Sequence, residues 1–233
     1  MGMGKDGFTF RAFSVRQDKC AMKVGTDGVL LGAWAPGGAR ILDIGTGTGL
    51  IALIMAQRFS GSMIDAIDID ADACEQARQN VAESPFANRI RVWQSDLQHF
   101  TANRPYDAIV CNPPFFINAL QCPDSKRTMA RHTGTLSPRD LFVHAYRLLA
   151  DEGTFSLVIP TDQAAGFVAE STIAGFFGKD RVRIKTTERK AAKRLLLSFT
   201  KKSSAARTDT EQTLFYGQQK SEWYHALTAN LYL

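Results

Sequence analysis

Short apolar runs alternate with stretches of helical periodicity between residues 40 and about 160. Each run is rich in apolar or β-branched residues and ends at a Gly, Asp, Asn or Pro, the pattern of a buried strand followed by a turn. We therefore predict strands at residues 40–44, 63–68, 90–94, 106–111 and 154–159. Strands that alternate with helices are typical of an α/β fold, in which helices cover both faces of a mostly parallel sheet.

The segments between these strands carry helix signals. Residues 50–58 follow a glycine-rich turn, and residues 72–84 repeat apolar side chains at four-residue spacing, which places them on one helix face. A third helix is predicted at residues 137–150. Ser137 is a suitable N-cap there, a proline follows at the first helical position, and an acid stands three residues after the cap.

The pattern changes after residue 160. A helix is predicted at residues 163–175, followed by two strands at 181–187 and 195–200. Their connection contains Glu-Arg-Lys-Ala-Ala-Lys and is too short for a crossover, so the two strands must be antiparallel neighbours. Residues 221–233 are predicted to form a final capped helix. The sheet is therefore expected to end in an antiparallel hairpin.

The chain as a whole has the composition of one globular domain. Its 233 residues are 45% apolar and 22% charged, which is sufficient for a full core. We expect a single domain over residues 1–233, with an N-terminal segment (1–39), a central core (40–160) and a C-terminal hairpin with a basic segment (161–233).

Membrane proteins and metalloproteins are disfavoured. The longest apolar stretch beside a helix signal, residues 50–56, is far shorter than the roughly 18 residues of a membrane span, and the N-terminus has no apolar signal core. We expect a cytoplasmic protein with no membrane partner. The four cysteines form no Cys-x-x-Cys pair, so free thiols and no metal site are expected.

Positive charge is concentrated near the C-terminus. Eleven Lys or Arg and only two acids lie between residues 178 and 207, whereas the formal net charge of the whole chain is +5. A basic segment on a mildly acidic body suggests a polyanionic partner such as a nucleic acid. The alternative is a solvated strand edge on which lysines prevent aggregation.

A glycine-rich turn follows the first predicted strand. The sequence Gly45-Thr-Gly47-Thr-Gly49 leads directly into a helix. Glycines let the backbone turn sharply and approach a ligand, and the helix N-terminus offers free N–H groups. A dinucleotide-binding fingerprint would need glycine at position 50, where Leu50 stands, so a nicotinamide or flavin enzyme is disfavoured.

Acidic residues stand at or near the ends of three successive predicted strands. Asp68 closes the second strand, where a carboxylate can accept both ribose hydroxyls of a nucleoside, and Asp96 after the third could accept from an adenine amine. Asp43 precedes the glycines and is suited to orient the turn or to meet a ligand ammonium. Together the three acids favour a nucleoside ligand.

The spacing Asp-x-Gly-x-Gly-x-Gly, with Asp68 and Asp96 behind it, resembles the class I S-adenosylmethionine methyltransferases. This resemblance implies a Rossmann-like, seven-stranded, mostly parallel sheet with an antiparallel last strand. It also implies S-adenosylmethionine as the cofactor.

The fourth predicted strand ends in Asn112-Pro113-Pro114-Phe115. An aromatic amine is a poor nucleophile until its nitrogen becomes pyramidal. The Asn112 side-chain oxygen and the Pro113 carbonyl can each accept one N–H of such an amine, which stabilises the pyramidal nitrogen and its developing positive charge. Phe115 offers a face on which an unstacked base can lie.

This Asn-Pro-Pro-Phe motif resembles the amino-methyltransferase branch of class I, which acts on adenine, on guanine or on a glutamine amide. The motif does not choose among these three acceptors. An rRNA guanine 2-amino methyltransferase and a protein-glutamine methyltransferase therefore stay open as alternatives. An RNA-binding module with a vestigial cofactor fold is a further alternative.

Residues 22–32, Arg131-His132 and the basic hairpin together are similar to the family of bacterial valine-tRNA adenine-N(6) methyltransferases. The resemblance covers nearly the whole chain and implies methylation of the adenine 3′ of the anticodon, with tRNA as partner and no DNA. It implies that Lys23, Thr26 and Asp27 help to close the cofactor pocket. The RNA contacts that it implies are Arg131, His132, Arg189, Lys190, Lys193 and Arg194.

Overall fold

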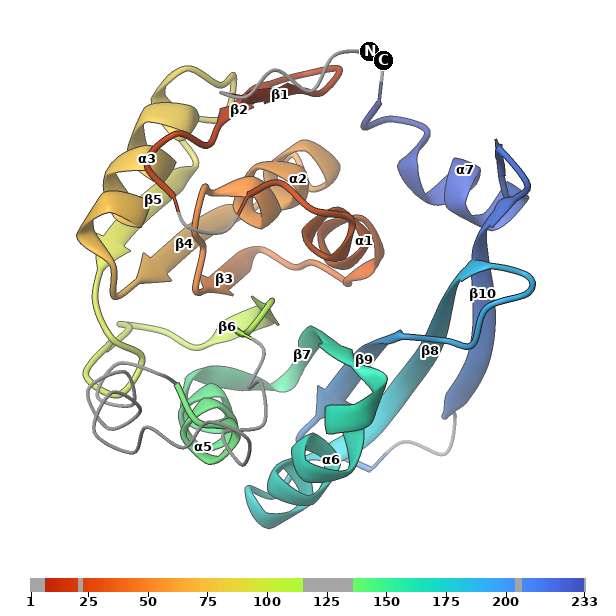
Figure 1. Cartoon of the computed structure of the whole chain (residues 1–233). Helices are drawn as coiled ribbons and strands as arrows, with labels where there is room; N and C mark the ends of the chain where they lie inside the picture. Colours follow the sequence, from red (N-terminus) through yellow and green to blue (C-terminus); the bar gives the residue numbers. More distant parts are fainter. Residues whose placement is uncertain (1–6, 21–22, 115–135, 204–206, 233) are drawn as a thin grey trace, which may run out of the picture.

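A computed structural model describes residues 7–20, 23–114, 136–203 and 207–232. Within these residues, one large sheet has nine strands in the order β11-β10-β8-β9-β7-β6-β3-β4-β5 (Figure 1). The strands are β3 (Arg40–Ile44), β4 (Met63–Asp68), β5 (Ile90–Gln94), β6 (Tyr106–Cys111), β7 (Leu149–Pro160), β8 (Phe177–Thr187), β9 (Arg194–Thr200), β10 (Thr208–Tyr216) and β11 (Gln219–Lys220).

Seven neighbouring strands of this sheet, from β5 to β8, form the predicted arrangement. Strands β5, β4, β3, β6 and β7 run parallel, and β9 is antiparallel to both β7 and β8. The α/β fold and its reversed strand are therefore confirmed. The predicted count of seven strands is wrong for the described residues, because β10 and β11 extend the sheet beyond β8.

Strand β10 was missed because its first half is polar. It begins Thr-Asp-Thr-Glu, and these four side chains are exposed, so no apolar alternation marks it as a strand. It pairs in parallel with β8, which is rich in basic residues. Asp209 on β10 forms ion pairs with Arg181 and Arg183 on β8, with guanidinium nitrogen to carboxylate oxygen distances of 2.5 and 2.6 Å. Cross-strand charge pairing supports this strand where the apolar pattern is weak.

Helices cover both faces of the sheet (Figure 1). Side chains from α1, α2, α3 and α7 pack into one apolar core, and side chains from α5 and α6 pack into a second core. These helices are α1 (Thr26–Trp34), α2 (Leu50–Arg58), α3 (Ala71–Ala82), α5 (Pro138–Leu148), α6 (Ala164–Ile173) and α7 (Glu222–Thr228). None of the helices in the described residues is long and apolar enough to span a membrane.

Several predicted helix boundaries are confirmed. The bounds of α2 are those predicted, and Ser137 caps α5 by accepting the backbone N–H of Asp140 at 3.1 Å. The final helix begins after its predicted cap, Ser221, but ends at Thr228, short of the predicted residue 233.

The carboxyl ends of the parallel strands meet at one edge of the sheet. The register places Ile44 at the end of β3 opposite Ile67 on β4 and opposite Cys111 on β6. The residues that come next after these positions, including Asp68 and Asn112, are therefore neighbours. In open α/β sheets this edge is where ligands bind.

Candidate functional site

A cavity of about 340 Å³ opens at this edge of the sheet. Three segments from distant parts of the sequence line it: the start of α1, the turn between β3 and α2, and the residue after β6. The lining residues are Lys23, Gly25, Thr26, Asp27, Gly28, Gly45, Thr46, Gly47, Thr48, Leu50, Ile51 and Asn112. Six residues predicted from the sequence are among them, whereas the two threonines of the glycine turn were not predicted.

The glycine turn adopts a backbone conformation that requires glycine. Gly45, Gly47 and Gly49 have φ values of 68°, 55° and 81°, all in the left-handed region that L side chains rarely adopt. The backbone N–H groups of Gly45 and Thr46 both donate to the Ile67 carbonyl of β4, at 2.9 and 3.0 Å. The turn is thereby tied to the neighbouring strand, and its backbone is open at Gly45, where an added β carbon would meet no atom within 4 Å.

Asp43 lies beneath this turn and is completely buried. Its Oδ2 accepts the Thr46 hydroxyl at 2.6 Å and the Ala52 backbone N–H at 3.1 Å, which joins the turn to the first part of α2. Its Oδ1 accepts no hydrogen bond from the described residues. Burial raises the pKa of Asp43 to about 7. Asp43 does not line the cavity, so the geometry favours a role in orienting the turn.

Asp68 holds the same turn from the side. Its Oδ2 accepts the Gly47 N–H at 2.8 Å, and its Oδ1 accepts the Asp70 N–H at 3.0 Å. A carboxylate has about four lone-pair sites, so these two bonds leave acceptor capacity for a ligand. Asp68 is therefore both a support for the glycine turn and a candidate ligand contact.

Asp96 follows β5, the strand next to β4. The Ser95 backbone N–H donates to the Asp68 carbonyl at 2.9 Å, which ties the ends of the two strands together. The Asp96 carboxylate is bonded to His99, and this hydrogen bond keeps the pKa of the Asp96 carboxyl below its usual value. Asp96 is therefore an ionised acceptor that follows the end of β5 beside the end of β4, although it does not line the cavity.

The end of β6 places Asn112 in the cavity wall. Pro113 is buried and Pro114 is exposed. The chain after Asn112 therefore packs into the protein at Pro113 and reaches the surface at Pro114. The predicted residues Phe115, Arg131 and His132 lie outside the described residues. Asn112 thus lines the same cavity as Lys23 and Thr26.

Two glycines bring the start of α1 against the start of α2. A β carbon added at Gly28 would lie 3.1 Å from Leu50 Cδ2, and one added at Gly32 would lie 3.1 Å from Ile54 Cβ. Gly28 and Gly32, four residues apart on α1, therefore lie against Leu50 and Ile54, which are four residues apart on α2. Because glycine has no side chain, the backbone of α1 can approach α2 closely at these two positions. This close packing places Thr26 and Asp27 beside the glycine turn.

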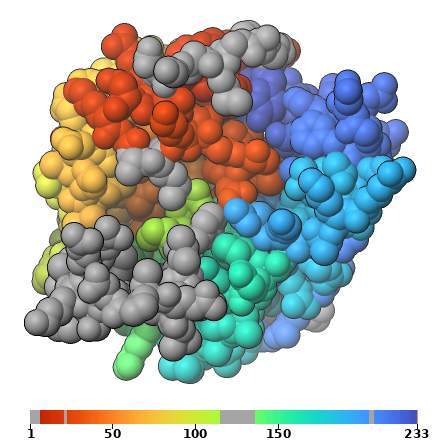
Figure 2. Space-filling view, in the orientation of Figure 1, coloured from red at the N-terminus to blue at the C-terminus, as the bar shows by residue number. Residues whose placement is uncertain are grey.

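An ion pair joins the cavity wall to the β8–β9 hairpin. The Arg194 guanidinium, at the start of β9, lies 2.7 Å from Asp27 Oδ2, and both side chains are mostly buried. The hairpin turn therefore stands next to the cavity. Figure 2 shows the light-blue hairpin beside the orange segment that contains α1.

Fewer basic side chains of residues 178–207 are available to bind a polyanionic partner than the sequence indicates. Arg181, Arg183 and Lys185 are paired with acids of β10, and Lys201 and Lys202 are paired with Asp151 and Glu152. Within the described part of the chain, the exposed basic side chains at the hairpin turn are not paired in this way. The residues there that form no ion pair with another described residue are Arg189, Lys190 and Lys193.

A wider hollow of about 450 Å³ lies against β4 and β5. It contains Arg40, Asp65 and Trp93 but none of the residues predicted to bind a ligand. The described residues also contain no group of three or more His, Cys, Asp or Glu side chains that could hold a metal ion. The smaller cavity above the glycine turn is therefore the candidate site.

Comparisons with known proteins identify relatives of this chain. Residues 29–190 match the family model of the methyltransferase small domain. The chain is 46% identical to a tRNA1(Val) (adenine(37)-N6)-methyltransferase of Parabacteroides distasonis, over 99% of each chain. Among solved structures, a predicted O-methyltransferase from Agrobacterium tumefaciens aligns with a TM-score of 0.67 at 20% identity, over 88% of this chain and 96% of that one.

A second solved structure has a ligand. The glycopeptide N-methyltransferase MtfA in complex with S-adenosyl-L-methionine aligns with a TM-score of 0.56 at 13% identity, over 76% of this chain and 99% of that one. At this identity the likeness concerns the fold.

The buried Asp43 carboxyl predicts a pH-dependent stability. The folded chain retains a proton up to about pH 7 that the unfolded chain loses near the ordinary value of 3.8. Stability should therefore fall as the pH rises from about 4 to about 7, by roughly 4 kcal/mol in total. Asp43→Asn removes this titration, while its amide oxygen can still accept the bonds from Thr46 and Ala52.

Urea unfolding of wild type and Asp43→Asn at pH 5 and pH 8 measures the effect. The variant should have the flatter pH dependence and should gain stability relative to wild type at pH 8. Asp72→Asn, which removes an exposed carboxyl at the start of α3, is the control and should follow wild type. Parallel pH profiles for wild type and Asp43→Asn would contradict this account of Asp43.

Proposed function

The chain belongs to the methyltransferase small domain family and, within it, to the tRNA1(Val) (adenine(37)-N6)-methyltransferases, and on this premise we propose that it methylates the 6-amino group of an adenine in tRNA. Its methyl donor is S-adenosylmethionine. The target that we propose is the adenine 3′ of the anticodon of valine tRNA, as the relatives' name states for them. Guanine 2-amino groups and glutamine amides are the alternative acceptors.

The cavity fits a donor that is part amino acid and part nucleoside. A β carbon added at Gly45 would meet no atom within 4 Å, so the backbone at this position of the turn is open to a ligand. When bound, S-adenosylmethionine supplies an electrophilic methyl group on a sulfonium centre. We propose that residues 45–49 hold its amino-acid part, that Asp68 accepts from the ribose hydroxyls and that Asp96 accepts from the adenine amine.

The segment at the start of α1 covers the other side of the cavity. Lys23, Thr26 and Asp27 all line it, and the Arg194 ion pair restrains Asp27. We propose that this segment closes over the bound donor and excludes water from it. In this proposal residues 1–39 and 161–233 are accessories to the core at residues 40–160, within one domain.

Asn112 and Pro113 act on the acceptor amine. The proposed acceptors are the Asn112 side-chain oxygen and the Pro113 carbonyl, each of which takes one N–H of the 6-amino group. Two acceptors outside the base plane favour the pyramidal nitrogen and stabilise its positive charge as the new bond forms. Neither group takes up a proton, so the surplus proton leaves to water. Pro114 and Phe115 complete the proposed motif, with Phe115 as the stacking face.

The hairpin turn is the proposed RNA contact. Arg189, Lys190 and Lys193 are exposed there, next to the cavity, and phosphate neutralisation is the main sequence-independent contribution to RNA binding. Arg194 lies at the base of the hairpin, where its ion pair with Asp27 fixes the distance between the RNA surface and the cavity. Arg131 and His132 stay predicted RNA contacts. We also propose a cytoplasmic location, in keeping with tRNA as substrate, and neither DNA nor a membrane as partner.

The single observation that supports this function best is Asn112 in the wall of the cavity above the glycine turn. Asn112→Ala should lower the rate of methyl transfer by about 100- to 1,000-fold, because one preorganised polar contact to the transition state is lost. The assay uses labelled donor and unmodified tRNA, followed by nucleoside analysis. Label on guanine alone, or on protein, would refute adenine methylation.

A matched control for this experiment is Asn103→Ala, which removes an exposed asparagine outside the cavity. This variant should methylate at the wild-type rate. Asn112→Ala should still bind tRNA, which shows that it is folded. Full activity of Asn112→Ala would place catalysis at another centre.

Because Lys190 and Lys193 form no ion pair with another described residue, their removal should weaken tRNA binding more than the removal of paired lysines elsewhere. Lys190→Ala/Lys193→Ala and Lys201→Ala/Lys202→Ala each remove two positive charges, but only the first pair lies at the hairpin turn. The hairpin variant should bind tRNA more weakly and with a smaller salt slope, by about 0.7 per lost contact on a single strand. Filter binding at several salt concentrations measures this. Equal losses in both variants would mean that net charge, and not the hairpin, attracts RNA.

A further inference from the structure

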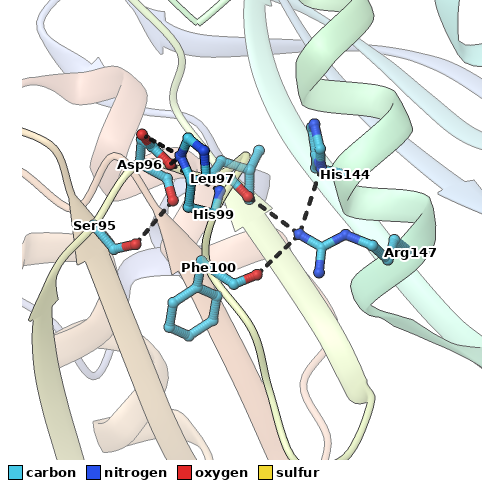
Figure 3. Close-up of polar contacts among 7 residues, drawn as sticks. All are labelled: Ser95, Asp96, Leu97, His99, Phe100, His144 and Arg147. Carbon is cyan, nitrogen blue, oxygen red and sulfur yellow. Dashed lines mark hydrogen bonds and ion pairs between the residues drawn. The ribbon is translucent and has the colours of Figure 1, made fainter.

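The turn that follows β5, residues 95–100, is held from two sides (Figure 3). On the sheet side, Ser95 is bonded to the end of β4, and Leu97 and Phe100 are buried in the second apolar core. On the helix side, one guanidinium nitrogen of Arg147 on α5 donates to the Leu97 carbonyl at 3.3 Å and to the Phe100 carbonyl at 2.9 Å. The backbone that carries Asp96 is therefore fixed.

Within this turn, Asp96 is bonded to His99 at two points. The His99 backbone N–H donates to Asp96 Oδ1 at 2.8 Å, and His99 Nδ1 lies 2.8 Å from each carboxylate oxygen. Because the Asp96 carboxyl is ionised and can only accept, Nδ1 must carry a proton and donate it to the carboxylate. Figure 3 shows the imidazole directed at the carboxylate.

Stability does not account for this arrangement of His99. Its side chain is 86% exposed, so it contributes little to the apolar core, and an exposed Asp–His pair adds little to the free energy of unfolding. What the imidazole does is restrain rotation of the carboxylate. The two donors use part of the lone-pair capacity of Asp96 and leave the rest for a third donor.

We propose that His99 is a positioning residue, which holds the Asp96 carboxylate in the orientation that accepts the adenine amino group of the methyl donor. The inference rests on the proposed function, because it requires an adenosyl ligand beside Asp96. His99 acts through Asp96 and does not itself contact the reacting atoms.

Helix α5 also faces the Asp96–His99 pair, through His144 and Arg147. Asp140, His144 and Arg147 lie on this helix, and Arg147 also approaches His144 Nδ1 at 3.4 Å. Desolvation lowers the pKa of His144, and the nearby Arg147 lowers it further. His144 makes no hydrogen bond to Asp96 among the described residues and serves as the matched control.

Calorimetric binding of two ligands tests the proposal. S-adenosylhomocysteine has the 6-amino group, and S-inosylhomocysteine has an oxygen in its place, so the ratio of their affinities reports the contact between Asp96 and the amine. His99→Ala should reduce this ratio by about 10-fold, because a hydrogen bond to a charged group becomes poorly oriented. His99→Asn, which retains an N–H donor at a similar position, should restore most of it. His144→Ala should leave the ratio at the wild-type value.

Three results would overturn the proposal. These are an unchanged ratio in His99→Ala, an equal reduction in His144→Ala, and a failure of a folded His99→Asn to recover the ratio. Each of them leaves the proposed function intact if the wild type binds S-adenosylhomocysteine and methylates tRNA. A wild type that binds neither ligand would refute the proposed function and this inference together.

Discussion

The site depends on one tight constraint, the turn from β3 into α2. The turn passes through three left-handed glycines, and two carboxylates hold it: Asp43 from beneath and Asp68 from the side. Full burial of a carboxyl costs free energy, and the raised pKa of Asp43 is a sign of that cost. Asp43 fixes the turn, so we attribute the free-energy cost of burying its carboxyl to the needs of the site and not to the packing of the core.

Three segments far apart in the sequence reach this turn by different physical means. Helix α1 approaches because Gly28 and Gly32 let its backbone pack against α2. The β8–β9 hairpin is joined to α1 by the Arg194–Asp27 ion pair. The strand register alone brings Asn112 beside the turn. A donor pocket, an acceptor residue and a basic surface are thus assembled on one edge of one sheet.

The sequence predicted the parts of the fold that have a strong apolar period. Strands such as β3 and β6 are short buried runs, and their predicted bounds match the structure. β10 was missed because it is polar and is supported by charge pairs across the sheet. In the site, the glycine turn and Asn112 follow from local motifs. The Asp27–Arg194 pair is 167 residues apart in sequence, so no local pattern could have predicted it.

The hydrogen bonds among the side chains of the site could not be predicted from the sequence either. The three acids were predicted as one set, yet Asp43 is buried beneath the turn, Asp68 braces it, and Asp96 is bonded to His99.

The central claim is that the donor lies above the glycine turn. A crystal structure with S-adenosylhomocysteine tests it directly: the homocysteine part should lie against Gly45–Gly49, with the adenosine between Asp68 and Asp96. A ligand seated instead in the hollow against β4 and β5 would contradict the account.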